Sequence, residues 1–316
     1  MVLVYIESHK GIFAKSAFET VTYGYKTAQA LGTSCVALCI GQATNSADLG
    51  KYGAEKVIHI EGHDDFDNQS YSSIISHIAD ELGAKVIILN NSASGKALIG
   101  RLAAKYDAGS IPGASTVPVV EGNKLIVKKS VFSGKAIATY EITSDMKFIS
   151  VMGNSIAPEE MGGTVQIEDR TVDIPRGRVV VKKTQKIEGS VPLPEADLVV
   201  SAGRGMKGPE NWGIIEELAE SLGASTACSR PVADSDWRPH YEHVGQTGVA
   251  IHPNLYIAIG ISGAIQHLAG VNNSKKIVVI NKDPEAPFFK AADYGVVGDL
   301  FEVVPRLTAA VKKLKK

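Results

Sequence analysis

The chain has 316 residues, of which 44% are hydrophobic and 21% are charged, and its formal net charge is −1. This length suits two ordinary globular domains, and the balanced charge argues against a basic surface for nucleic acid. No apolar run reaches the ~18 residues that a membrane span needs, and the N-terminus lacks the basic region of a signal peptide. The three cysteines, Cys35, Cys39 and Cys228, give no disulfide framework, so we expect a reducing, cytoplasmic setting.

The first half of the chain alternates between apolar strand patterns and amphipathic helix patterns. Strands are predicted at residues 2–6, 35–40, 56–60 and 86–89, and helices at residues 14–31, 70–82 and 96–106. This alternation predicts a mainly parallel sheet covered by helices. The pattern then changes, and short strands in hairpins are expected at residues 125–127, 131–132, 136–142, 148–151 and 179–181.

A linker is predicted at residues 184–196, which contain one glycine and two prolines and show little periodicity. It separates two domains, residues 1–186 and residues 187–316. In the second domain, strands are expected at residues 198–202, 226–228, 255–259 and 277–280, and helices at residues 210–222, 262–269 and 299–314. The sequence therefore predicts a two-domain α/β protein, with a parallel sheet and added β-hairpins in the first domain and a doubly wound sheet in the second.

Residues 260–267 form the most informative segment. An apolar strand over residues 255–259 runs into a glycine turn and then into a helix pattern. Such a turn places free backbone N–H groups and the positive end of a helix at one point, which favours phosphate binding. Ser262 is expected to cap this helix. Because Gln246 and Thr247 add hydrogen-bonding side chains nearby, the sequence predicts a phosphate-bearing cofactor with a polar ring system.

Two arginines follow other strands of the same domain. Arg204 lies between two glycines after the strand at 198–202, and Arg230 follows the short strand at 226–228. Ligands of parallel sheets bind at the carboxyl ends of the strands, where an arginine can clamp a phosphate. At both positions the alternative is an ordinary turn with a surface arginine. For His267 the alternative is a helical histidine whose hydrogen bonds are satisfied within the protein.

Patterns for catalysis and metal binding are weaker. Residues 92–96 resemble a phosphate loop, but the first glycine of that motif is missing and Ala97 follows the lysine. The histidines lack a zinc-binding spacing. No Ser–His–Asp or paired-carboxylate arrangement has supporting context, so we assign neither a catalytic residue nor a metal ligand.

Five ordered segments of the second domain match a known family, namely residues 203–205, 229–230, 244–248, 262–267 and 281–286. The match continues through residues 293–295 and 299–301. Over essentially all of residues 196–308, the chain resembles the large (α) subunit of electron-transfer flavoproteins. The first domain is similar, more loosely, to the nucleotide-binding-like α/β domain of this family. That domain is expected to serve assembly rather than ligand binding.

The resemblance implies one FAD, held mainly by the second domain. Arg204 and the turn at 262–267 would face the pyrophosphate and ribityl chain, while His267 would approach the pyrimidine edge of the flavin. Ser229, Arg230, Gln246 and Thr247 would surround the isoalloxazine ring, and Asn281, Asp299 and Leu300 would hold the adenosine half. The implied cofactor-binding residues are Arg204, Ser229, Arg230, Val244, Gly245, Gln246, Thr247, Ser262, Gly263, Ala264, Ile265, Gln266, His267, Asn281, Asp299 and Leu300. Residues 232–237 depart from the family by being more acidic.

The resemblance also implies an electron carrier that forms a heterodimer with a smaller β subunit. Electrons would come from flavin dehydrogenases, such as the acyl-CoA dehydrogenases of fatty acid β-oxidation, and would leave to a membrane quinone oxidoreductase. Because such a carrier performs no substrate chemistry, we expect this chain not to be an enzyme in its own right. Arg230 is a permanent cation, so it should favour reduction of the flavin more than Thr247 does.

Two other functions stay open on the residues alone. A subunit of an NAD(P)-dependent oxidoreductase is supported by the partial glycine fingerprint at residues 260–263. The missing G-x-G-x-x-G spacing and the presence of Gln246, Thr247 and Arg230 oppose it. A nucleotide sensor without redox activity is the third possibility, and it would bind an adenine nucleotide without a coloured cofactor.

Overall fold

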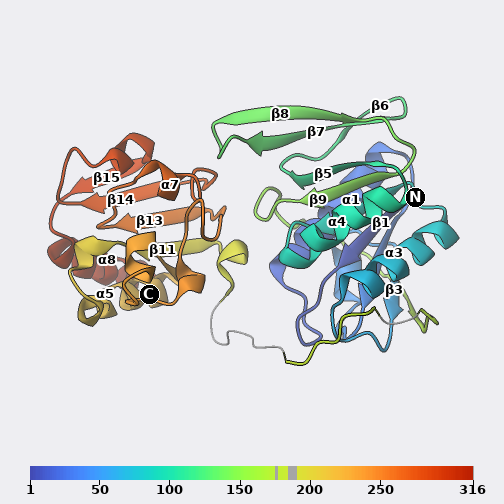
Figure 1. Ribbon diagram of the computed structural model, residues 1–316, viewed down its shortest axis with the longest axis horizontal. Helices are drawn as coiled ribbons and strands as arrows, with labels where there is room; N and C mark the ends of the chain where they lie inside the picture. Colours follow the sequence, from blue (N-terminus) through green and yellow to red (C-terminus); the bar gives the residue numbers. More distant parts are fainter. Residues whose placement is uncertain (175–176, 184–190, 316) are drawn as a thin grey trace. The chain divides into compact units, whose positions relative to one another are not determined.

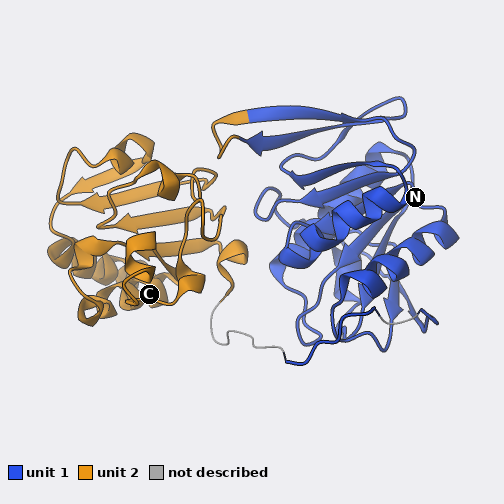
Figure 2. Ribbon diagram, viewed as in Figure 1, with its two compact units in different colours: residues 1–131, 137–186 blue, residues 132–136, 187–316 orange. Residues whose placement is uncertain are grey.

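The chain folds into two compact units, shown in Figure 2. The first unit contains residues 1–131 and 137–186, and the second contains residues 187–316 together with the short segment 132–136. The computed structural model describes residues 1–174, 177–183 and 191–315. The linker predicted at 184–196 therefore falls largely on residues 184–190, which lie outside the described residues.

A seven-stranded sheet forms the centre of the first unit (Figure 1). Its strand order is β10-β3-β2-β1-β4-β9-β5, and every adjacent pair is parallel. The strands are β1 (Val2–Ile6), β2 (Cys35–Ile40), β3 (Lys56–Ile60), β4 (Val86–Asn90), β5 (Gly109–Ala114), β9 (Lys147–Val151) and β10 (Gln166–Arg170). The predicted parallel α/β architecture of this unit is confirmed.

Helices cover both faces of this sheet. Successive residues of a strand point to opposite sides, so each strand contributes side chains to a core on either face. In β1, Val2 and Val4 join one buried core, which includes Val21 of the first helix, whereas Leu3 and Tyr5 join the other. The helices are α1 (Lys15–Ala30), α2 (Asp48–Lys51), α3 (Asn68–Leu82) and α4 (Ala93–Lys105). Among the described residues of the whole chain, no helix has the length and apolar character that crossing a bilayer requires.

The hairpins predicted in the middle of the chain form only in part. A small three-stranded sheet contains β6 (Val119–Glu121), β7 (Lys124–Val131) and β8 (Ala136–Ile142). The expectation that 148–151 is a hairpin strand is wrong, because β9 pairs in parallel with both β4 and β5 and is buried along its whole length. Burial on both faces is typical of a parallel strand under helices. The described residues 179–181 form no strand.

Two strands of the large sheet are not predicted from the sequence. β10 is the edge strand beside β3, and its charged residues hide the apolar pattern by which strands are recognised. Charge on an edge strand is a common protection against unwanted pairing. β5 contains Pro112 and two glycines, residues that are rare in strands, and its register shifts between Pro112 and Ala114.

Helix ends of the first unit follow the sequence signals. Gly83 ends α3 in the left-handed conformation at φ 61°, which a glycine just past a helix adopts readily. The side chain of Ser92 accepts a hydrogen bond from the N–H of Gly95 at 3.0 Å and so caps α4. The apparent phosphate loop at 92–96 is therefore a helix cap.

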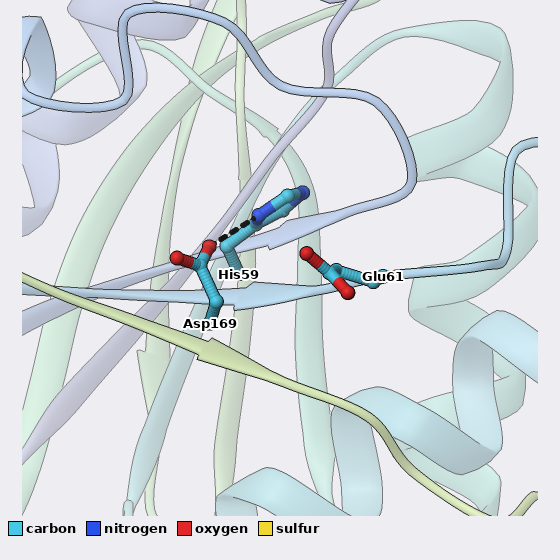
Figure 3. A group of neighbouring side chains, drawn as sticks. All are labelled: His59, Glu61 and Asp169. Atoms are coloured by element: carbon cyan, nitrogen blue, oxygen red, sulfur yellow. Dashed lines mark hydrogen bonds and ion pairs between the residues drawn. The ribbon is translucent and has the colours of Figure 1, made fainter.

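His59, Glu61 and Asp169 gather where β3 pairs with the edge strand β10 (Figure 3). Each offers one possible metal-ligand atom, and these atoms lie within 4.8 Å of one another. His59 Nδ1 lies 2.8 Å from Asp169 Oδ1, and Nε2 lies 2.6 Å from the carbonyl oxygen of Gly41. Since both ring nitrogens already face oxygen atoms, the imidazole ties the edge strand to the turn after β2, and we assign the group a structural role.

A five-stranded parallel sheet forms the second unit. Its order is β12-β11-β13-β14-β15, so the chain first adds a strand on one side of β11 and then builds outward on the other. The strands are β11 (Leu198–Ala202), β12 (Ser225–Cys228), β13 (Leu255–Ile259), β14 (Ile277–Asn281) and β15 (Tyr294–Val297). This is the doubly wound sheet that the sequence predicts, with its reversal point between β11 and β13.

The two faces of this sheet carry different layers (Figure 1). Helices α5 (Gly213–Leu222) and α8 (Leu300–Leu314) contribute to one core, with Ile215 and Val304 among its buried residues. The other core contains Val244, Val271 and Phe288 from the connecting segments. Two short helices, α6 (Arg230–Ala233) and α7 (Ile265–Leu268), begin just beyond β12 and β13.

Three expectations for the second unit need correction. The helix predicted at 262–269 spans only α7, and its first flanking residue is Ala264, with no capping side chain. Ser262 therefore does not cap it; instead, its carbonyl oxygen accepts a hydrogen bond from Phe288 N at 3.1 Å. The helix predicted at 210–222 begins at Gly213. β15 was not predicted, because this short edge strand is exposed along its length.

Candidate functional site

A pocket of about 540 Å³ opens at the carboxyl ends of the strands of the second sheet. The segments that follow β11, β12, β13 and β14 all contribute to its walls. The pocket thus lies at the reversal of strand order between β11 and β13, where open parallel sheets bind ligands. Its volume falls in the ~300–1,000 Å³ range of small-molecule sites.

Glycines allow two of these segments to touch. A Cβ atom added to Gly203 would lie 2.5 Å from the carbonyl oxygen of Gly260, and one added to Gly205 would lie 2.7 Å from Gly260 Cα. Gly260 itself has a φ of 61°, a conformation that L side chains rarely adopt. The close approach of the two turns therefore requires glycine on both sides.

The turn between β13 and α7 presents free backbone donors. Among the described residues, the N–H groups of residues 263–266 donate to no other backbone group. The turn is held from outside, because Asn281 Nδ2 donates to Ile261 O at 3.0 Å and Gln246 N donates to Gln266 O at 2.7 Å. Since α7 has only four residues, the amides themselves, rather than a long helix dipole, make this turn suitable for an anionic group.

His267 is buried in the wall of the pocket. Its Nε2 atom is 2.8 Å from the hydroxyl oxygen of the buried Tyr256, whereas its Nδ1 atom has no hydrogen-bond partner among the described residues. Burial, with a smaller contribution from the nearby His243, lowers the pKa of His267 to about 4. The imidazole is therefore neutral at pH 7, and its free nitrogen can hydrogen-bond to a bound molecule.

Arg230 begins α6 at the mouth of the pocket, and 62% of its side chain is exposed. Its Nε atom lies 3.2 Å from Asp234 Oδ2, one helical turn further along, and its Nη1 atom lies 3.5 Å from Thr247 Oγ1. Asp234 belongs to the acidic stretch at residues 232–237. The guanidinium is thus a paired cation at the rim rather than an isolated charge.

A second, smaller hollow adjoins the pocket. It shares Arg204, Gly205, Gly260 and Asn281 with the pocket and is also lined by Lys207, Lys282, Asp299, Leu300 and Phe301. The Asp299 side chain accepts a hydrogen bond from Phe301 N at 2.9 Å and caps α8. Asp299 therefore has a structural role as well as a place at this hollow.

Most of the residues that the sequence nominates come together here. Those that line the pocket are Arg204, Ser229, Arg230, Val244, Gly245, Gln246, Thr247, Ser262, Ala264, Gln266, His267 and Asn281. Asp299 and Leu300 line the adjoining hollow. Gly263 and Ile265 line neither. A Cβ on Gly263 would lie 2.4 Å from Phe288 Cβ, and Ile265 is 59% exposed.

Sequence reasoning missed His243 among the pocket-lining residues. It immediately precedes the matching segment 244–248 and ends the short 3₁₀ turn His240–Glu242. Neither the pattern of apolar residues nor the matching segment marks it. Only the three-dimensional position, against the loop that carries Gln246 and Thr247, shows that it belongs to the site.

The doubly wound sheet and its glycine-lined pocket define an α/β protein that holds a nucleotide-type cofactor at the carboxyl edge of the sheet. Residues 192–272 match the family model described as the electron transfer flavoprotein FAD-binding domain, and residues 2–175 match the electron transfer flavoprotein domain. The chain belongs to the electron transfer flavoprotein family, and its second domain is the FAD-binding domain. The predicted resemblance and the predicted cofactor are confirmed.

Similar proteins cover nearly the whole chain. Electron transfer flavoprotein subunit alpha of Bacillus subtilis (strain 168) is 39% identical, over 99% of this chain and 98% of that protein. The protein of the same name from Thermoanaerobacterium thermosaccharolyticum is 35% identical over the same shares. Protein FixB of Escherichia coli O157:H7 is 36% identical over 90% of this chain and 93% of its own length.

The residues of the pocket fit FAD. The free amides of residues 263–266 suit a pyrophosphate. The unpartnered Nδ1 of His267 is a buried polar atom that a polar ring could satisfy. The glycines at 203, 205 and 260 leave the backbone open to close approach. These features are those of a site for a large, partly anionic cofactor.

Proposed function

We propose that this chain is the α subunit of a heterodimeric electron carrier that receives electrons from flavin dehydrogenases and passes them to a membrane quinone oxidoreductase. The observation that carries the proposal is the make-up of the pocket. Free amides, close glycines, a rim guanidinium and a neutral buried imidazole are suited to binding and tuning a cofactor rather than to transforming a substrate. The expectation that the chain is no enzyme on its own belongs to this proposal.

The proposal assigns each part of the site to a part of FAD. Arg204 and the 262–267 turn hold the pyrophosphate and ribityl chain, and the hollow at Asp299 takes the adenosine half. Ser229, Arg230 and the loop 244–247 surround the flavin ring. These assignments rest on the pocket and hollow sharing Arg204 and Asn281, so that one extended molecule can occupy both.

Bound FAD supplies the capacity to accept and release single electrons. The chain's own residues set how readily this happens. Arg230 places a positive charge at the rim, which favours added negative charge, while Asp234 offsets part of that field. His267 offers a hydrogen bond without a charge because its pKa is about 4.

The partners proposed for the carrier come from its family. Relatives of this length are named subunit alpha, which supports assembly with a smaller β subunit. Acyl-CoA dehydrogenases of fatty acid β-oxidation are the proposed donors. A cytoplasmic site of action is in keeping with Cys35, Cys39 and Cys228, which are free, buried thiols whose pKa burial raises to about 12.

Co-expression with the β subunit and an absorbance spectrum of the purified complex test the proposal. We expect flavin bands at about 370 and about 450 nm, with bleaching when an acyl-CoA dehydrogenase and its substrate are added. A control variant, Gly213→Ala, changes a glycine around which a new Cβ meets no atom within 4 Å, so its spectrum should not change. A complex that stays colourless with excess FAD, or that binds NAD instead, would refute the carrier.

A further inference from the structure

His243 is an ionisable residue in the wall of the proposed flavin pocket. Its backbone pairs with Cys228 of β12, and the next amide, Val244 N, donates to Cys228 O at 3.1 Å. The ring rests on the backbone of the following loop. A Cβ added to Gly248 would lie 2.8 Å from Nδ1, and one added to Gly245 would lie 3.3 Å from Nε2. His243 is thus fixed in position by the loop that carries Gln246 and Thr247.

The groups that face His243 come from four elements. Burial is the largest influence and lowers the pKa of His243. The charge of Arg230 and the proximity of His240 lower it further, while Asp234 on α6 raises it. His267 of α7 lines the same pocket and is close enough for the two imidazoles to interact electrostatically. Cys228 of β12 stays a neutral thiol, since burial raises its pKa to about 12.

Glu242, the acidic residue that precedes His243 in the sequence, is paired with an arginine. It accepts hydrogen bonds from Arg238 at 2.9 and 2.7 Å, so its negative charge is already balanced. Asp234 is paired with Arg230. In the oxidised protein, the surroundings of His243 therefore favour its neutral imidazole. A single negative charge added to the pocket changes this balance, because it favours the charged form of the imidazole.

We propose that His243 takes up one proton when one electron enters the pocket and releases it when that electron leaves. The inference rests on the proposed function and adds to it a residue that couples electron transfer to proton transfer. His243 suits this role better than its neighbours. Arg230 is permanently charged, whereas His267 has one ring nitrogen held by Tyr256 and a pKa of about 4. The two histidines are almost equally exposed, at 8% for His243 and 7% for His267, so the hydrogen bond and the lower pKa of His267 distinguish them.

The step is balanced in charge and atoms. The electron comes from the donor of the carrier reaction, and the proton comes from water or buffer and binds one ring nitrogen of His243. An N–H bond forms, and no other covalent bond changes. When the electron passes to the acceptor, the N–H bond breaks and the proton returns to solvent. The net charge of the pocket is then the same before and after each step.

The test is the midpoint potential of the first one-electron reduction of the purified holo complex, measured from about pH 5.5 to about pH 8.5. One proton per electron predicts a fall of up to about 59 mV for each tenfold decrease in proton concentration. The fall is expected between the pKa of His243 in the oxidised protein and its higher pKa in the reduced protein. We expect His243→Gln to flatten the slope by at least half, while the control His77→Gln, at an exposed position of α3, leaves it unchanged.

A second measurement does not depend on the variant. The ¹³C shift of the His243 ring, assigned by its loss in His243→Gln, reports protonation directly in the wild-type complex. We expect a neutral ring in the oxidised protein at pH 7 and a protonated ring after one-electron reduction. A ring that is equally protonated in both states, or a wild-type potential that does not change with pH, overturns the inference. A complex without flavin would instead refute the proposed function itself.

Discussion

Arg230 and Asp234 form an ion pair at the mouth of the pocket, with 3.2 Å between Nε and Oδ2. Both side chains are more than half exposed, at 62% and 52%. The positive charge proposed to favour flavin reduction is therefore shared with a carboxylate of the same helix turn.

Removing that carboxylate should raise the first reduction potential of the holo complex. Exposed ion pairs contribute only ~0.2–1 kcal/mol, and 1.4 kcal/mol corresponds to about 59 mV for one electron. We therefore expect Asp234→Asn to raise the potential by on the order of 10–40 mV. Asp236→Asn is the matched control, since it removes the same charge from an exposed residue two positions beyond the Asp234 that pairs with Arg230. Equal shifts in a redox titration of the two variants would argue against a specific role for the pair.

Arg230 should matter more than Thr247 for the same potential. Two charges ~4 Å apart at an effective dielectric of ~20 interact by about 4 kcal/mol, or on the order of 170 mV. Exposure and pairing place the effect of Arg230 below this bound. A neutral hydrogen bond is worth ~0.5–1.5 kcal/mol, or about 20–60 mV. Redox titration should show a larger decrease for Arg230→Ala than for Thr247→Ala, and a larger effect of Thr247→Ala would reverse the ranking.

The sequence predicts the second unit well where strands are apolar and their ends carry glycine or arginine. Strands 198–202 and 255–259 coincide with β11 and β13, and Arg204 and Arg230 lie beyond the strand ends, as predicted. Edge strands were missed, since β10 and β15 are exposed and lack a buried pattern. The sequence also does not predict that β9 pairs with β4. This pairing depends on contacts between residues far apart in the chain, which local periodicity does not encode.

Within the site, the sequence found the segments but not every role. Gly263 was nominated for the cofactor, yet it packs against Phe288 with a φ of 83°. Ser262 lines the pocket without capping α7. His243 was missed altogether. Tertiary packing decides which side of a short turn faces a pocket. Residue type and spacing alone therefore do not reveal it.

The contact between the turn at Gly203 and the turn at Gly260 should be sensitive to a single added methyl group. Gly203→Ala places Cβ 2.5 Å from the carbonyl oxygen of Gly260, a backbone atom that cannot rotate away. We expect at least a tenfold loss of FAD affinity and a lower melting temperature, since overpacking typically costs ~1–3 kcal/mol. Gly213→Ala, where the added Cβ meets nothing within 4 Å, is the control and should be neutral or slightly stabilising. Unchanged affinity in Gly203→Ala would show that the turns do not need this contact.

The neutral His267 should make the second unit less stable in acid. Its pKa is about 4 in the folded protein, against an ordinary 6.5, so the unfolded chain binds the extra proton between these values. Stability is then greatest above pH 6.5 and falls as the pH decreases toward 4, by about 3 kcal/mol at most. His267→Gln removes the titrating group and should show a shallower loss over that range.

Both tryptophans of the chain, Trp212 and Trp237, belong to the second unit, so their fluorescence reports its unfolding. Urea titrations of the purified chain at pH 7 and near pH 5 would measure the effect for wild type and His267→Gln. His77→Gln serves as the control, because that exposed histidine lies on α3 in the first unit. If wild type and His267→Gln lose equal stability on acidification, the acid sensitivity arises from other groups, and the neutral imidazole does not govern it.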